Sequence, residues 1–370
     1  MDSNASNALF VGSDIYREAA FGKHHPLSII RVAGVMDVCQ MLGWFDHEQF
    51  RESPQASVAQ LRDFHDADYV DALIAADQKG SVEKSVREKY RLGTMENPLF
   101  PGLFKRASTA VGGSILAAEL AAQERVVFHP SGGTHHGRAG RASGFCYFND
   151  PVFAILTFLA SSIERVLYVD LDAHHGDGVQ DAFASDPRVL TISIHEEKRW
   201  PHSGLVGDRA GGEARNLPVP GAFNDSELDY LVEQAVLPLA EEFRAEALVI
   251  TCGADALEGD PLSRLALSNA GLWNAVEKLV KLTPRTVVLG GGGYNPWTVV
   301  RCWSGLWGRL SKQVIPPALP SQVSTFLASF QSDLIDEDEV PATWINTLAD
   351  EPNDGPVRPE IEKLPGLVLH

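Results

Sequence analysis

The sequence predicts an α/β fold in which a central parallel sheet is flanked by helices on both faces, within a single domain. Three observations favour this fold. Short apolar runs alternate with stretches of helical periodicity, the runs are apolar throughout as in strands buried on both faces, and polar clusters follow several of them. Because ligands bind at the carboxyl ends of strands in such sheets, we expect the chemistry there. The predicted strands are residues 8–11, 126–128, 166–169, 189–194, 247–251 and 286–289.

The remaining segments divide into helices, a tail and an extension. Residues 1–7 are polar and are predicted to form a disordered tail. Residues 8–310 carry the alternating pattern and form the predicted domain. Residues 311–370 are acidic and contain several prolines, so we expect an extension packed on that domain. The predicted helices cover residues 28–42, 64–76, 106–122, 226–244 and 270–282.

The composition is globular and narrows the possible partners. The chain has 370 residues, is 44% hydrophobic and carries a formal net charge of -18. That charge argues against general affinity for nucleic acid or anionic membranes. We expect neither a membrane-spanning helix, because no apolar run is long enough, nor a signal peptide, because the first residues lack its basic and apolar regions. The cysteines are widely spaced without a CxxC pair, which predicts free thiols and a cytoplasmic location.

The most informative stretch is residues 165–178, RVLYVDLDAHHGDG. It begins as a buried strand and then places Asp170, Asp172 and His174 at positions of the same parity, which share one side while the backbone is extended. His175 and Asp177 follow on the turn. Single residues of these types at a strand end are usually turn residues or caps. Carboxylates gathered at the end of a buried strand, however, require neutralisation, and a divalent metal supplies it.

A third metal ligand is expected from another strand end. Asp255 in GADALEGDP is the best placed candidate to join Asp172 and His174. Two carboxylates and one imidazole balance the charge of a divalent ion and leave a coordination position open, as catalysis requires. Zinc and ferrous iron both suit this set.

The sequence also supplies groups for proton transfer. His135 and His136 follow a glycine-rich turn, and Asp170 and Asp177 are available to orient them. Tyr294 follows four glycines after a predicted strand, where its hydroxyl could stabilise an oxyanion. Together these features predict metal-assisted hydrolysis, in which water activated by the metal attacks a carbonyl group.

The motifs SGGTHH, ASGFCYFND, YVDLDAHHGDG, GADALEGDP and GGGGYNP resemble, in this order, the motif series of the histone deacetylase superfamily. The resemblance runs from about residue 8 to residue 307, and it looks most like class I deacetylases and the bacterial acetoin-utilisation deacetylases. It implies that residues 8–310 form a deacetylase catalytic domain of the arginase–deacetylase fold. It also implies zinc-dependent hydrolysis of N-ε-acyl-lysine amides in proteins or peptides.

The resemblance also implies a role for each candidate residue. Asp172, His174 and Asp255 would bind the zinc, and His136, paired with Asp177, would be the general base and acid. The pair of His135 and Asp170 would assist electrostatically, and Tyr294 would polarise the acyl carbonyl. The implied substrate-binding residues are Glu96 at the rim, and Gly144, Phe145, Trp200 and Leu262 along an acyl-lysine tunnel. A structural K⁺ or Na⁺ would lie near Asp170, Asp172, His174, Ser193 and Ile194, and Arg31 would line an inner region for acetate release.

Three positions depart from the family pattern. Thr134 stands before the histidine pair where the family usually has tryptophan, and Trp200 stands at a tunnel position that is usually phenylalanine. The rim carboxylate is Glu96 rather than an aspartate, which makes it one methylene longer. These changes concern the size of the substrate and recognition of its backbone.

Three alternatives share these features. An arginase-like ureohydrolase would need a second metal, but Asp255 is followed by Ala256 and Leu257 rather than by another carboxylate. A deacetylase of acetylpolyamines or other small acylamines would use the same chemistry, although Leu262 is not the acidic residue that marks such enzymes at the tunnel mouth. A non-catalytic acyl-lysine reader would be expected to lack a ligand, a histidine or the tyrosine. The sequence leaves the oligomeric state open.

Overall fold

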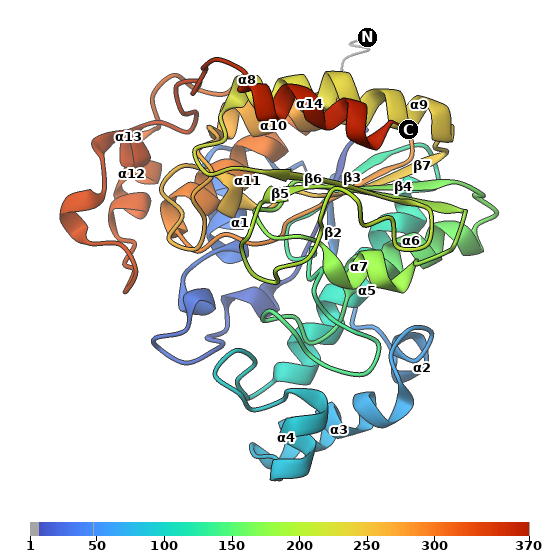
Figure 1. Cartoon of the computed structure of the whole chain (residues 1–370). Helices are drawn as coiled ribbons and strands as arrows, with labels where there is room; N and C mark the ends of the chain where they lie inside the picture. The colour runs from blue at the N-terminus through green and yellow to red at the C-terminus, as the bar shows by residue number, and fades with distance from the viewer. Residues whose placement is uncertain (1–6, 47, 370) are drawn as a thin grey trace.

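The computed structural model describes residues 7–46 and 48–369, so residues 1–6 of the predicted tail lie outside the described part (Figure 1). One sheet of eight strands, paired in parallel throughout, runs through the molecule in the order β2-β1-β3-β8-β7-β4-β5-β6. The predicted α/β class and parallel sheet are therefore confirmed. The strands are β1 (Leu9–Gly12), β2 (Phe50–Glu52), β3 (Val126–His129), β4 (Val166–Asp170), β5 (Val189–Glu196), β6 (Ala214–Val219), β7 (Ala247–Thr251) and β8 (Thr286–Leu289).

The central strands are apolar throughout because both faces of the sheet are covered. In β4, Leu167 and Val169 belong to the hydrophobic core on one face, whereas Val166 and Tyr168 belong to the core on the other face. Successive side chains of a strand point to opposite faces, so a strand between two helical layers needs apolar residues at every position.

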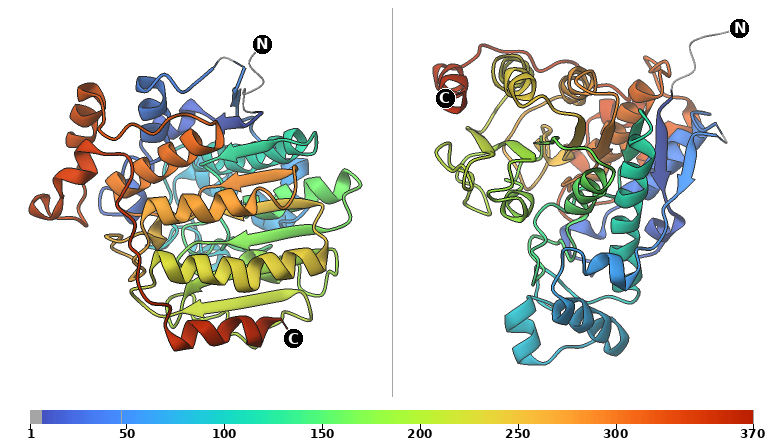
Figure 2. Two further views of the ribbon diagram at one scale, coloured as in Figure 1. Left: turned by 90° about the horizontal axis from the view of Figure 1, so that it is seen from above. Right: turned by 90° about the vertical axis from the view of Figure 1, so that its right-hand side faces the viewer.

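Helices form a layer on each face of the sheet (Figures 1 and 2). The helices that contribute to the first core are α1 (Val32–Met41), α8 (Asp225–Leu231), α9 (Leu237–Phe243), α10 (Asn269–Leu279), α11 (Pro296–Leu310), α12 (Ser321–Ala328) and α14 (Pro359–Val368). The second core includes residues of α5 (Leu103–Ala121), α6 (Asp150–Ala160) and α7 (Asp177–Ala182). Within the described residues, no helix has the length and apolar character needed to cross a membrane.

A smaller cluster lies beside the N-terminal part of α5. It contains α2 (Val58–Leu61), α3 (Ala67–Lys79) and α4 (Lys84–Tyr90), which extend away from the sheet at the bottom of Figure 1. At the other end of the chain, α14 packs against β6 and α8, and α13 (Ala342–Asn346) packs against α11 and α12. Single turns occur at η1 (Asp14–Arg17), η2 (Pro26–Ser28), η4 (Ala254–Ala256) and η5 (Glu337–Glu339).

Some predicted elements differ from the observed ones. β2 and β6 were not predicted, because β2 is short and partly exposed and β6 is an edge strand containing Pro218. The helix predicted from residue 28 begins at Val32, since residues 26–28 form a separate turn. The helix predicted over residues 226–244 contains a π-helical turn, η3 (Val232–Val236), just before Pro238.

Candidate active site

The candidate residues gather at the carboxyl ends of the middle strands. Asp172 and His174 follow β4, and Asp255 lies in η4 just after β7. The histidine pair follows β3, and Tyr294 follows β8. Because β3, β8, β7 and β4 are consecutive neighbours in the sheet, loops that are far apart in sequence meet at one edge.

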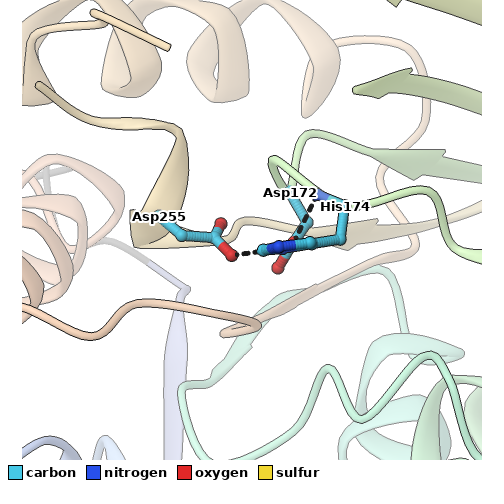
Figure 3. Close-up of side chains that lie close together, drawn as sticks. All are labelled: Asp172, His174 and Asp255. Carbon is cyan, nitrogen blue, oxygen red and sulfur yellow. Dashed lines mark hydrogen bonds and ion pairs between the residues drawn. The ribbon is translucent and has the colours of Figure 1, made fainter. Parts of the chain in front are cut away.

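Asp172, His174 and Asp255 point toward one another (Figure 3). One ligand atom from each lies within 4.8 Å of the others, all three residues are buried, and no other such cluster occurs among the described residues. The remaining lone pairs of the carboxylates accept backbone N–H groups: Asp172 Oδ2 from Gly292 at 2.6 Å and Asp255 Oδ1 from Ala173 at 3.1 Å. These bonds hold both carboxylates in orientations in which an oxygen of each faces the imidazole of His174.

The electrostatics of this cluster call for positive charge between the carboxylates. Burial, and after it the charge of the neighbouring Asp172, raise the pKa of Asp255 to about 6. Burial lowers the pKa of His174, but its contacts with Asp172 and Asp255 outweigh burial and raise it to about 10. Two carboxylates and one imidazole that share a dry site therefore match the charge of a divalent cation, and the residues present fit a mononuclear metal site.

Each histidine of the pair is oriented by its own aspartate. Nδ1 of His135 lies 2.7 Å from Oδ2 of Asp170, and Nδ1 of His136 lies 2.8 Å from Oδ1 of Asp177. The two imidazole centroids are 3.9 Å apart. A second partner holds Asp177, because its other carboxylate oxygen accepts a hydrogen bond from Arg138.

The two imidazoles differ in charge. Burial lowers the pKa of His135, but Asp170 and Asp172 outweigh it and raise the pKa to about 9. In His136, burial and then the neighbouring His135 lower the pKa to about 3, although Asp177 opposes them. At neutral pH His135 is a cation, and His136 is a neutral imidazole able to accept a proton.

The glycine loop after β8 brings Tyr294 to the same place. A Cβ added to Gly292 would lie 2.0 Å from Oδ2 of Asp255, so only glycine allows the loop to approach the carboxylates this closely. The ring of Tyr294 lies 6.5 Å from that of His174 and 5.9 Å from that of Phe145. Burial raises the pKa of the Tyr294 hydroxyl well above its usual value, so this group stays a donor.

The predicted tunnel residues line one cavity of about 730 Å³. The rings of Trp200 and His136 are nearly perpendicular with centroids 4.6 Å apart, and the ring of Phe145 lies 5.9 Å from that of Tyr294. The lining includes all five predicted substrate-binding residues together with three other candidate site residues: Glu96, Gly144, Phe145, Trp200 and Leu262, with His136, His174 and Tyr294.

Glu96 makes a contact that the sequence did not indicate. Its Oε1 accepts the backbone N–H of Gly144 at 2.6 Å, so one carboxylate oxygen is already engaged with the tunnel wall. The longer side chain of glutamate thus connects the rim loop to the turn that carries Phe145.

Residues implied for the monovalent cation lie at neighbouring strand ends. Asp170 and Ser193 are register partners in β4 and β5, and Asp170 Oδ1 accepts the N–H of Asp172 at 3.1 Å. The Ser193 hydroxyl faces Nδ1 of His195 at 2.8 Å, and Ile194 is buried one position further along β5. The monovalent cation itself stays a prediction.

Comparison with known proteins agrees with this geometry. Residues 25–310 match the histone deacetylase domain. The chain belongs to the histone deacetylase family. It is 33% identical to acetoin utilization protein AcuC of Bacillus subtilis, with 81% of each chain covered, and 31% identical to human histone deacetylase 1, with 81% of this chain and 64% of the human protein covered. The crystal structure of a histone deacetylase homologue from Aquifex aeolicus superposes with a TM-score of 0.92 at 32% identity, covering 97% of this chain and 98% of that one.

This histone deacetylase family hydrolase contains supporting residues that the sequence reasoning missed. Asp260 is buried and accepts the N–H groups of Tyr294 at 2.7 Å and Leu262 at 2.9 Å, so it joins the tyrosine loop to the tunnel mouth. Asp150 accepts the N–H groups of Gly133 and Thr134 and so holds the turn before the histidine pair. Both aspartates stand inside quoted motifs, and an aspartate within a glycine-rich or Asn-Asp motif was the available signal.

Proposed function

We propose that this protein is a metal-dependent deacylase that hydrolyses the amide bond of N-ε-acyl-lysine in proteins or peptides. The observation that carries the proposal is the position of the three-ligand cluster: it lies beside two His–Asp pairs and a tyrosine at the end of a cavity with aromatic walls. Such a cavity suits the long, apolar stem of an acylated lysine, whose terminal amide would reach the catalytic groups.

Asp172, His174 and Asp255 would hold the metal, and zinc and ferrous iron both suit this donor set. When bound, such an ion polarises a carbonyl group and makes water more acidic. The hydrogen bonds from Gly292 and Ala173 keep the two carboxylates oriented for that role.

His136 would transfer the protons. Its Nδ1 is paired with Asp177, so in the neutral imidazole the base is Nε2. His136 also lines the cavity, where it can take a proton from attacking water and later return it to the departing lysine amine. His135 keeps a positive charge 3.9 Å away, measured between ring centroids, and favours negative charge that develops on the acyl oxygen.

Tyr294 would donate its hydroxyl proton in a hydrogen bond to the acyl oxygen. Asp260 supports this role because it fixes the backbone of Tyr294 through the N–H bond. The hydroxyl donates at all physiological pH values, since burial raises its pKa. A positioned donor of this kind lowers the barrier most where charge develops in the transition state.

The tunnel mouth favours acyl-lysine over an acetylpolyamine. Leu262 itself offers no partner to a second ammonium group, although Glu196 and Glu197 also line the cavity, and Glu96 with the adjoining Gly144 would hold the backbone of a peptide. The test is kcat/KM on an acetyl-lysine peptide, on blocked acetyl-lysine and on N-acetylputrescine. The proposal predicts a preference for the peptide, and a tenfold preference for N-acetylputrescine would replace acyl-lysine by a polyamine as the substrate.

Two variants sharpen this test. Leu262→Glu should shift the preference toward N-acetylputrescine by roughly ten- to a hundred-fold, because it adds a partner for the second ammonium. Leu205→Glu is the matched control, since Leu205 is 74% exposed and does not line the cavity. Glu96→Ala should reduce kcat/KM for the peptide more than for blocked acetyl-lysine. If Leu262→Glu and Leu205→Glu changed the substrate preference equally, Leu262 would have no specific role in selecting the substrate.

A further inference from the structure

A second, smaller cavity of about 150 Å³ lies behind the catalytic groups. His136, Gly144, Phe145 and Tyr294 line both this inner cavity and the tunnel. An acyl group that lies beside Tyr294 and His136 would therefore be next to the inner cavity as well as in the tunnel.

Two arginine side chains place positive charge in the lining of the inner cavity. Arg31 and Arg106 line it, and the lining includes no aspartate or glutamate, although the chain carries a net charge of -18. The side-chain hydrogen bonds of both arginines, among the described residues, go to backbone carbonyls. Arg31 donates to Gly291, and Arg106 donates to Ile15 at 2.9 Å and Glu18 at 3.3 Å. Neither guanidinium group therefore forms an ion pair with a carboxylate among the described residues, and the nearby carboxylates of Asp255, Asp172 and Asp260 for Arg31, and of Glu18 for Arg106, act only through space.

Two more features favour an anion in this cavity. Nε of Arg31 is buried and has no hydrogen-bond partner among the described residues, a costly state that an acceptor would relieve. Helix α1 begins at Val32, which lines the same cavity, and none of the side chains that the structure describes caps that end of the helix. The partial positive charge of a helix N-terminus adds to that of the arginines.

The charges also act on each other. Burial lowers the pKa of both guanidinium groups, and the positive charge of Arg31 lowers that of Arg106 further. A carboxylate between them would remove this repulsion and could form charge-assisted hydrogen bonds with both.

We propose that the inner cavity binds the distal carboxylate of a dicarboxylic acyl group, so that the enzyme removes acyl groups such as succinyl from amines. The proposal rests on the amide hydrolysis proposed above and adds the acyl specificity. One water is consumed: its oxygen bonds to the acyl carbon, the C–N bond breaks, the amine leaves with a proton, and the second carboxylate remains unchanged. The departing monocarboxylate of an ordinary acyl group has the same chemistry, and the experiment must separate the two sources.

The decisive comparison uses three acyl-lysine peptides that differ only in the acyl group. Succinyl carries the distal carboxylate, succinamoyl has the same size without charge, and acetyl is the short reference. For the wild-type, metal-loaded enzyme we expect kcat/KM to be at least about tenfold higher for succinyl than for succinamoyl, the scale of one charge-assisted contact. Arg106→Met should abolish this ratio and change kcat/KM for acetyl by less than about threefold. Arg62→Met, which removes an exposed arginine paired with Asp71, should leave the ratio unchanged.

Every outcome of the comparison decides the proposal. A wild-type ratio of succinyl to succinamoyl below about tenfold overturns it, even if Arg106→Met does not fold. If the wild type lacks the succinyl preference but Arg106→Met weakens inhibition by acetate, the cavity is a site for the product acid only. Arg106→Lys, which keeps the charge, should retain part of the succinyl preference, and a full loss with normal stability would contradict a simple charge effect.

The amine side is tested separately. The same three acyl groups are placed on putrescine. If only the putrescine amides are hydrolysed, the acyl-lysine proposal fails, yet the ratio of succinyl to succinamoyl still tests the inner cavity. If both amines are accepted and the ratio is one on each, the inner-cavity proposal alone fails.

Discussion

Replacing Gly144 by alanine is expected to disturb the cavity wall and His136, the proposed general base, together. Gly144 has a φ of 53°, a left-handed conformation that costs an alanine about 1–2 kcal/mol. The added Cβ would lie 2.3 Å from Cη2 of Trp200 and 2.6 Å from Cδ2 of His136. Neither contact can persist, so the indole and the imidazole must both move.

The expected effect on catalysis depends on how freely each of the two rings can move. Trp200 is 37% exposed and can rotate toward solvent, whereas His136 is buried and held by Asp177. A displacement of His136 by about 1 Å should lower kcat by about 10²-fold, and the backbone strain should lower the free energy of unfolding by about 1–2 kcal/mol. The assay is kcat on an acetyl-lysine peptide together with urea unfolding.

Two further variants make this prediction specific. Gly207→Ala is the matched control, because its φ is not in the left-handed region and an added Cβ would meet nothing within 4 Å. Combining Gly144→Ala with Trp200→Ala removes the indole contact but not the contact with His136, so kcat should stay low. A Gly144→Ala enzyme with near-normal kcat would refute the packing of Trp200 and His136 around this glycine.

Two other residues give independent predictions. Tyr294→Phe should fold, keep its metal and bind substrate, but lose kcat by roughly 10²–10³, the scale of one oxyanion donor; near-normal turnover would make Tyr294 a packing residue. Burial lowers the pKa of His65 to about 4. As the pH falls from about 6.5 to 4, the unfolded chain therefore binds a proton that the folded chain does not, and the free energy of unfolding should drop by up to about 3 kcal/mol. In urea titrations His65→Gln should make this slope shallower by the share of one proton, although the low pKa of His136 still contributes to it. Replacing the exposed His24 should leave the slope unchanged, and an unchanged slope in His65→Gln would contradict the prediction.

Much of the fold was predictable because its central strands are buried on both faces. Such strands must be apolar at nearly every position, and β4, β7 and β8 are recognisable in the sequence as apolar runs. The edge strands β2 and β6 escape this rule, since one is partly exposed and the other contains a proline. Local sequence also could not locate the π-helical turn at residues 232–236, which lies within an otherwise continuous helical pattern.

The candidate site likewise has parts that could be predicted from the sequence and parts that could not. Asp172, His174 and Asp255 were predictable as a group because parallel strands bring their carboxyl ends to one edge. The contact between Glu96 and the Gly144 N–H was not, since it joins a loop to a distant turn through packing alone. The family resemblance implied that Arg31 lines an inner region, but the presence of Arg106 beside the same cavity was not predictable, because Arg31 precedes α1, Arg106 lies in α5, and nothing in either segment indicates the other.

The most direct test of the proposed function is the metal content of the dialysed protein, measured alongside its activity. Because the described residues contain one cluster of three ligands, we expect about one divalent ion per chain. Chelation should abolish deacetylation of an acetyl-lysine peptide, and zinc or ferrous iron should restore it. Asp255→Ala should lose both metal and activity. Full activity in the chelated wild type or in Asp255→Ala would contradict the metal site, and two ions per chain would favour the arginase-like alternative.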